Sequence, residues 1–240
     1  FRRHYNVVSL EQVLASRRTG AALPPRALLI TFDDGWADNA DYALPALRRA
    51  GLPALLFVVA DAVGTRQPFF QERLIAAWRR GALSVDELVA ALPEDQLPAA
   101  GVDESIASLR KVIARLEALD ADTRARVLEP LMTRLDDGHR HMVTVEELQR
   151  LQDGGVALGL HGKTHTPMRL AEDLDAELGG AREALARQLG QPRARAESMS
   201  FPHGSFDAAI AQRAREAGYE LVFTSVPVLN PTGHGVGWLL

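Results

Sequence analysis

The sequence contains no cysteine, and this absence excludes disulfide bridges and thiolate metal ligands. Any metal site must therefore be built from histidine and carboxylate side chains. Long apolar runs are also missing, since none approaches the roughly 20 residues of a membrane-spanning helix. Excess positive charge is missing too: the formal net charge is −4, which gives no argument for nucleic acid or an acidic membrane surface as a partner. We expect no transmembrane segment and no nucleic-acid partner.

What is present describes an ordinary globular chain. Its 240 residues are 47% hydrophobic and 24% charged, enough for one domain with a core that needs no covalent staples. The chain opens at Phe1 without Met and ends in the apolar segment Val236–Leu240, which resembles a strand cut short. We therefore expect the gene product to be longer at both ends. A cysteine-free protein suits reducing and oxidising compartments alike, so a cytoplasmic or extracytoplasmic location and the oligomeric state stay open.

Two adjacent carboxylates stand where an apolar run ends. Asp33 and Asp34 belong to the segment Thr31–Gly35 (TFDDG), which follows the run Ala27–Ile30. Ligands of α/β proteins bind at the carboxyl ends of strands, and two carboxylates there can divide metal binding from proton transfer. The alternative is a plain turn, because Asp-Asp-Gly is also good turn chemistry.

Two histidines follow a second apolar run. His161 and His165 enclose the segment HGKTH, directly after Val156–Leu160. Their spacing would also suit one face of a helix, but Gly162 and Pro167 favour a loop. Imidazole is the commonest transition-metal ligand, and mixed imidazole–carboxylate sets suit zinc. A histidine pair and a carboxylate pair at two strand ends predict a metal site.

Strands and helices alternate along most of the chain. Apolar runs predict strands at 27–32, 54–60, 156–160, 197–201 and 220–224. Capping residues and helical periodicity predict helices at 9–18, before Gly51, at 144–154, 174–189 and 207–217. Repeated strand–helix units favour a parallel sheet.

The segment at about 66–141 interrupts this alternation with mostly helical sequence. Apolar residues at helical spacing predict one packed helix face: Leu109, Val112, Ile113, Leu116 and Leu119. Its aromatic residues Phe69, Phe70 and Trp78 suit anchoring in a core, or stacking against sugars. We expect His139 and His141 to be solvated loop residues. The segment is a packing subdomain or a cover that shapes a substrate cleft.

Three segments in order resemble the motifs of a known family. TFDDG, HGKTH and the later Phe201–Gly204 (FPHG) are similar to the first three motifs of the polysaccharide deacetylases, metal-dependent carbohydrate esterases that include chitooligosaccharide and peptidoglycan deacetylases. The resemblance runs from about Val7 to Ser225. It implies an α/β fold, an irregular and incomplete (β/α) barrel, over a single catalytic domain at 1–240 with a helical insertion at about 66–141.

The resemblance also implies roles for the first two motifs. Asp33 would be the catalytic base, while Asp34, His161 and His165 would hold one divalent metal ion. Zinc is the first expectation, with cobalt, nickel and manganese as alternatives. The expected reaction is hydrolysis of N-acetyl groups on an amino-sugar polysaccharide or oligosaccharide. The open alternatives are an O-acetyl esterase, a small-amide hydrolase, and a homologue that binds carbohydrate without catalysis.

The resemblance also implies roles for the third motif. By analogy, Pro202 and His203 would bind substrate, the backbone N–H of His203 would face the oxyanion, and its side chain would act near the leaving group. His234 is a second candidate for the general acid, although its segment reads first as a surface turn.

The chain departs from the family at two places. Many members carry an arginine four residues before the proline of the third motif, where this chain has Ser198. The nearest arginine is Arg195, which, with Arg193, we expect at the surface. The family's two later motifs have no convincing match.

Overall fold

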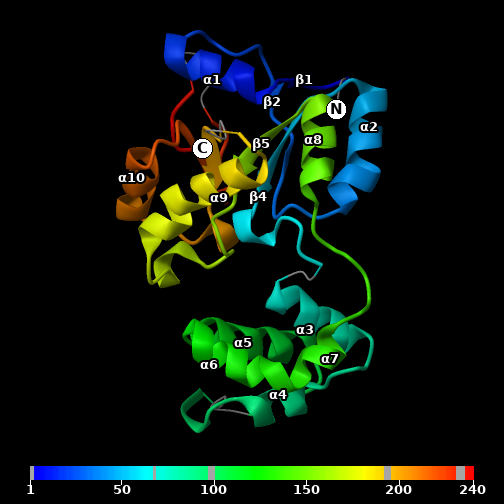
Figure 1. Cartoon of the computed structure of the whole chain (residues 1–240). Helices are drawn as coiled ribbons and strands as arrows, with labels where there is room; N and C mark the ends of the chain where they lie inside the picture. The colour runs from blue at the N-terminus through cyan, green and yellow to red at the C-terminus, as the bar shows by residue number, and fades with distance from the viewer. Residues whose placement is uncertain (1–2, 67–68, 97–100, 192–195, 231–235) are drawn as a thin grey trace. The chain divides into compact units, whose positions relative to one another are not determined.

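The computed structural model describes residues 3–66, 69–96, 101–191, 196–230 and 236–240. The chain divides into two compact units (Figure 1): Phe1–Thr65 with His141–Leu240, which we call the sheet unit, and Arg66–Arg140, the helical unit. The helical unit occupies the segment in which the sequence predicts a helical insertion. That the whole chain acts as one catalytic domain stays a prediction.

Five parallel strands form the main sheet of the sheet unit. They are β3 (Thr31–Phe32), β4 (Ala54–Val58), β5 (Val156–Leu160), β6 (Ser198–Ser200) and β7 (Leu221–Phe223). The strands lie in chain order, β3-β4-β5-β6-β7, and every pair is parallel. Parallel strands in sequential order are typical of a (β/α) barrel. In the described part of the chain β3 and β7 stay at opposite ends of the order, so the predicted α/β class and incomplete barrel are confirmed.

The prediction of one continuous strand at 27–32 is wrong. Instead, β2 (Ala27–Leu28) pairs with β1 (Asn6–Val7) in a separate two-stranded sheet, and β3 begins at Thr31. The backbone changes partner between them: the Leu28 carbonyl accepts from Val8, whereas the Ile30 carbonyl accepts from Leu55. One apolar run therefore serves two sheets.

Capping chemistry places the helices of the sheet unit. They are α1 (Leu10–Thr19), α2 (Leu44–Ala50), α8 (Val145–Asp153), α9 (Ala181–Gln188) and α10 (Ala208–Glu216). The capping boxes predicted at Ser9 and Thr144 are both formed. The helix predicted at 174–189 forms, and a π-helical turn, η6 (Ala176–Gly180), lies within it before α9. A similar turn, η1 (Asn39–Ala43), precedes α2. Figure 1 shows α2 and α8 side by side beside the strands.

Both faces of the interior strand β4 are covered. Leu56 and Val58 join the core that includes α8 and α9, whereas Leu55 and Phe57 pack in the cluster that contains α1. Burial on two faces explains the continuous apolar run of β4, which is typical of a parallel strand. Beside β7, the C-terminal segment pairs through Leu239, as its strand-like sequence predicts.

The helical unit has its own apolar core. Its helices are α3 (Phe70–Arg79), α4 (Val85–Ala91), α5 (Ile106–Glu117), α6 (Ala121–Leu128) and α7 (Met132–Leu135). The predicted face of α5 is buried, and Phe70 and Trp78 pack against the same core. This packing favours core anchoring for these two aromatics over sugar stacking.

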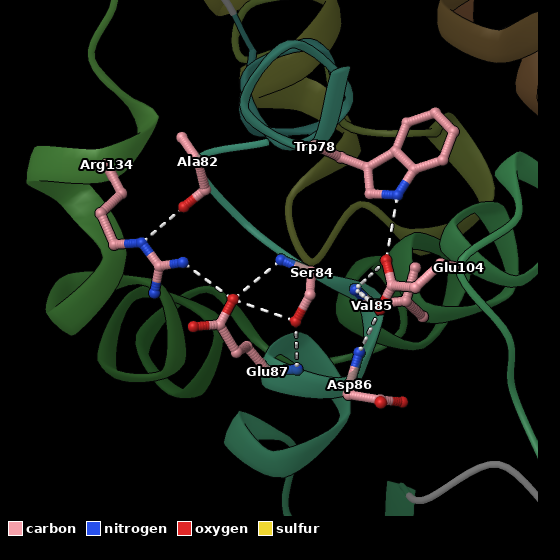
Figure 2. Close-up of polar contacts among 8 residues, drawn as sticks. All are labelled: Trp78, Ala82, Ser84, Val85, Asp86, Glu87, Glu104 and Arg134. Carbon is pink, nitrogen blue, oxygen red and sulfur yellow. Dashed lines mark hydrogen bonds and ion pairs between the residues drawn. The ribbon is translucent and has the colours of Figure 1, made fainter. Parts of the chain in front are cut away.

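Two carboxylates accept N–H groups at the start of α4, as Figure 2 shows. Glu104 accepts the backbone N–H groups of Val85 and Asp86 and the indole N–H of Trp78. Glu87 completes a capping box with Ser84 and pairs with Arg134 at 2.8 Å. These contacts satisfy N–H groups that a helix start leaves without partners.

No helix within the described ranges has the length and apolar character needed to cross a membrane.

Candidate metal centre

The predicted site residues meet at the carboxyl edge of the sheet. Asp33 and Asp34 directly follow β3, and His161 directly follows β5. His203 lies in the short turn η7 (Pro202–Gly204) after β6. Because all these strands are parallel, their carboxyl ends lie at one edge, where open α/β sheets bind ligands.

Three side chains converge there. The Nε2 atom of His161 lies 3.5 Å from Oδ1 of Asp34, and Nε2 of His165 lies 3.3 Å from the same oxygen. The ligand atoms of all three lie within 4.8 Å of one another. Both histidines are buried. The structure thus brings together the three residues that the sequence analysis pairs with a metal, and their role as ligands stays a prediction.

Hydrogen bonds on the outer side orient His161 and Asp34. His161 Nδ1 lies 2.9 Å from the Ser200 carbonyl, which can only accept, so Nδ1 carries the proton and Nε2 presents its lone pair. The indole N–H of Trp36 donates to Oδ2 of Asp34 at 2.9 Å, which leaves Oδ1 facing the histidines. This is the arrangement by which proteins orient metal ligands.

The charges in the cluster fit a cation. Burial, with the neighbouring His165, lowers the pKa of His161 to about 4, so this imidazole is neutral near pH 7. Burial opposes ionisation of Asp34, but His165, His161 and Trp36 outweigh it and hold the pKa of Asp34 below its usual value. A neutral nitrogen lone pair and a carboxylate oxygen repel each other at 3.5 Å unless positive charge lies between them.

The spacing also fits zinc. Two ligands on a tetrahedral zinc ion with bonds of about 2.0–2.1 Å lie about 3.3–3.4 Å apart, close to the two distances observed. Two imidazoles and one carboxylate match the donor set of catalytic zinc sites, which leave a fourth position open. The residues present therefore fit a divalent ion.

The backbone is strained at this cluster. Asp34 (φ 75°), His165 (φ 67°) and His203 (φ 56°) adopt the left-handed conformation that non-glycine residues rarely take. Such conformations cost of order 1–3 kcal/mol each and persist where the surroundings impose them, often at functional sites.

Asp33 stands beside the cluster over a hollow of about 560 Å³. Asp34, Trp36, Asp38 and Tyr42 also line this hollow. Although Asp33 is exposed, loss of hydration at the hollow and the adjacent Asp34 raise its pKa to about 6, against the influence of His165. A cation held by Asp34 would oppose this shift, because positive charge favours the carboxylate. Asp33 would then be ionised and able to accept a proton near pH 7.

The third motif reaches the same edge. The rings of His165 and His203 lie 4.5 Å apart between centroids. Pro202 is buried, while His203 is exposed. The roles of Pro202 and His203 in binding substrate, and of His203 in catalysis, stay predictions.

Ser198 stands where many family members have an arginine, and it is buried within the sheet. Its side chain is buried on β6 and packs over Gly159 of β5. In the described ranges no arginine forms an ion pair with Asp33. His234, Arg193 and Arg195 lie outside the described residues.

The sequence analysis missed several residues at this edge. Trp36 and Tyr42 were not singled out. His141 lies in a loop as predicted, but the prediction that it is solvated is wrong. His141 is half-buried, its ring meets Trp36 edge to face at 6.3 Å, and its carbonyl accepts the Ala37 N–H. An aromatic residue two positions after Asp34 was the one available signal.

Solved structures share this fold. A de-N-acetylase from Aggregatibacter actinomycetemcomitans aligns with a TM-score of 0.55 and 18% identity, covering 100% of this chain and 79% of that one. The deacetylase domain of BpsB from Bordetella bronchiseptica aligns with a TM-score of 0.56 and 18% identity, covering 100% and 78%. Identity this low shows the fold alone, a parallel sheet curled into an irregular half-barrel, and it agrees with the predicted architecture.

Sequence comparison gives a shorter match and a longer one. The Bacillus subtilis (strain 168) protein YxkH, whose name places it with the polysaccharide deacetylases, is 35% identical over 49 residues, or 20% of this chain and 18% of that protein. This stretch spans less than a fifth of YxkH. The family model described as "Polysaccharide deacetylase" matches residues 20–222, and so the chain belongs to the polysaccharide deacetylase family.

Proposed function

We propose that this protein is a metal-dependent hydrolase that removes N-acetyl groups from an amino-sugar-containing polysaccharide or oligosaccharide. The observation that carries the proposal is the convergence of Asp34, His161 and His165, with Asp33 beside them and outside the set. Three residues suffice to bind an ion. A further carboxylate that lies next to the ion but does not bind it can act as the general base in acyl hydrolysis.

A divalent ion, zinc by its donor set, would supply Lewis-acid chemistry that polarises the acyl oxygen and makes a nearby water more acidic. The residues of the chain do the rest. Asp33 would take the proton of the attacking water. The backbone N–H of His203, placed by its left-handed turn, would donate to the developing oxyanion. Its exposed imidazole would give a proton to the departing nitrogen.

The hollow beside Asp33 supports a carbohydrate substrate. It is open to solvent at Tyr42, whose side chain is 77% exposed, and an exposed ring offers a face on which a sugar ring can stack. The carboxylates of Asp33 and Asp38 line the same wall and would accept hydroxyl groups. Preference for the N-acetyl bond is supported by the de-N-acetylase that shares this fold.

Acetate release tests the proposal. Metal-stripped protein, with and without added zinc, would be given N-acetylated oligosaccharides such as chitooligosaccharides, O-acetylated xylo-oligosaccharides and small acetamides. We expect zinc-dependent release of acetate from the N-acetylated sugars, abolished by chelator and restored by zinc. Release from O-acetylated sugars alone would replace the proposed bond, and release that survives chelator would overturn the metal's role.

A further inference from the structure

Glu177 is a buried carboxylate that the proposed reaction does not use. It lies in the π-helical turn η6 and is only 6% exposed. Within the described ranges no ion pair joins it to a basic side chain. The ammonium of Lys163, in the loop that Glu177 contacts, pairs with Asp61 instead. A buried charge of this kind is costly unless several N–H or O–H groups satisfy it.

Its partners all belong to the loop between the two histidines. Oε2 of Glu177 accepts the backbone N–H groups of Lys163, at 2.8 Å, and Thr164, at 3.1 Å. Oε1 accepts the hydroxyl of Thr164 at 2.5 Å. The carboxylate therefore binds the middle of the loop and reaches neither His161 nor His165 directly.

The opposite side of the same loop is also fixed. The carbonyls of Gly162 and Lys163 accept the N–H groups of Ala60 and Asp61, in the turn η2 (Ala60–Ala62) after β4. The turn η2 thus donates to the loop's carbonyls, and Glu177 accepts its N–H groups. The backbone carbonyls of Gly162 and Lys163 and the N–H groups of Lys163 and Thr164 therefore have partners other than the two imidazoles.

The loop needs this support because His165 (φ 67°) adopts a left-handed conformation that is unfavourable for a non-glycine residue. Gly162 (φ 75°) adopts the same conformation without that penalty. A Cβ on residue 162 would approach Oε2 of Glu177 to 3.0 Å, so the carboxylate packs closely against the loop. Strained conformations persist where surrounding contacts over-determine them, and Glu177 supplies three such contacts.

We propose that Glu177 is a positioning residue of the metal centre. Its carboxylate clamps the loop Gly162–Thr164, so that His161 and His165 already point their Nε2 atoms at Asp34 before an ion arrives. This inference rests on the proposed function and adds to it a residue that touches neither ion nor substrate. Without the clamp, ion binding would have to order the loop and hold His165 in its strained conformation.

Metal affinity tests the clamp without any substrate. Zinc would be titrated calorimetrically into metal-stripped wild-type, Glu177→Gln and Glu177→Ala proteins, with Glu183→Ala as the matched control. Glu183 is an exposed glutamate in the first turn of the following helix, α9. Removing residues that orient metal ligands typically weakens binding 10–100-fold. We expect about that loss for Glu177→Ala, a smaller loss for Glu177→Gln, which keeps one acceptor oxygen, and none for Glu183→Ala.

The visible spectrum of the cobalt-substituted protein supplies a second measurement. Its d–d bands report ligand geometry, so we expect them to shift or broaden in Glu177→Ala and to stay unchanged in Glu183→Ala. A general loss of stability would lower the unfolding temperature without altering these bands in the folded protein. If Glu177→Ala does not fold, Glu177→Gln decides, because its amide occupies the same volume.

The outcomes separate the two proposals. If folded Glu177→Ala and Glu177→Gln bind zinc with wild-type affinity and give the wild-type cobalt spectrum, the clamp is overturned and the proposed function stands. If the wild-type protein binds neither zinc nor cobalt, the proposed function fails, and the clamp fails with it.

Discussion

The two units use carboxylate side chains in different ways: Glu87 and Glu104 of the helical unit are exposed, whereas Asp34 of the sheet unit is half-buried. In the helical unit, Glu104 and Glu87 accept backbone N–H groups at the start of α4 (Figure 2). In the sheet unit, the Nε2 atoms of His161 and His165 lie 3.5 and 3.3 Å from one oxygen of Asp34, and His161 presents its lone pair there. The first arrangement is complete as it stands. The second gathers a carboxylate and two imidazoles in an arrangement that fits a divalent ion.

Backbone strain divides along the same line. The non-glycine residues with positive φ among those described are Arg26, Asp34, His165 and His203. All four belong to the sheet unit; Asp34 and His165 are two of the three residues of the candidate metal centre, and the ring of His203 contacts that of His165. The helical unit therefore follows local conformational preferences, while the sheet unit departs from them where its site residues stand.

The largest expected effect comes from Asp33→Asn. Loss of a general base typically lowers turnover by about 10²–10⁴-fold, and we expect a fall in kcat of this size. Zinc affinity should change by no more than about threefold, because Asp33 lies outside the ligand set. Stability should not fall, since the change removes a poorly hydrated charge next to Asp34. Acetate release and calorimetric zinc titration measure the two properties separately.

Asp41→Asn is the control for this change, because Asp41 is exposed in η1 and does not line the hollow. It should keep wild-type turnover. Equal losses in both variants would mean that general surface charge, and not a base at position 33, supports the reaction.

Zinc should stabilise the sheet unit through its histidines. An ion at a hundred times its dissociation constant adds about 2.7 kcal/mol to the folded state, so the wild-type unfolding temperature should rise by several degrees. His161→Ala should abolish this rise. His139→Ala, at an exposed histidine of the helical unit, should retain it. A rise that survives in His161→Ala would place the ion elsewhere.

Glu104→Ala should show the reverse pattern. Three N–H groups lose their acceptor, which costs about 1–3 kcal/mol of the free energy of unfolding. Zinc affinity and kcat should stay at wild-type values. Denaturant titration measures the loss, with the exposed Glu129→Ala as control. Loss of zinc affinity in Glu104→Ala would end the division of roles between the units.

The smallest effect is expected at Tyr42. An aromatic contact contributes about 0.5–1.5 kcal/mol beyond its buried area, so Tyr42→Ala should raise KM by about fivefold and leave kcat nearly unchanged. Tyr42→Phe keeps the ring and should behave like wild type. Steady-state kinetics on an N-acetylated oligosaccharide measures both. An unchanged KM in Tyr42→Ala would remove the ring from the substrate site.

Local signals account for the part of this structure that could be predicted from the sequence. The capping boxes at Ser9 and Thr144 fix helix starts with groups three residues apart, and both form as expected. The carboxylates and histidines follow apolar runs, and parallel strands bring those ends to one edge. The candidate site could therefore be assembled from short motifs together with the order of the strands.

Features that depend on distant partners escaped prediction. The run 27–32 changes sheets because Leu28 and Ile30 find different backbone partners, which no local pattern records. The sequence does not show that His141 is half-buried, because its carbonyl accepts the N–H of the distant Ala37 and its ring contacts Trp36. Glu177 looks like an ordinary helix glutamate, and only the folded chain reveals that its carboxylate faces a loop thirteen and fourteen positions away.

A hydrogen bond between Gly64 and Val143 joins the two ends of the segment that contains the helical unit. The N–H of Gly64 donates to the carbonyl of Val143 at 2.8 Å, so the excursion between β4 and β5 leaves and re-enters at a single point. The entropy of closing a loop grows only logarithmically with its length, and the excursion brings a core of its own. The helical unit could therefore be replaced by a short loop, and β4 and β5 would be expected to pair much as they do now.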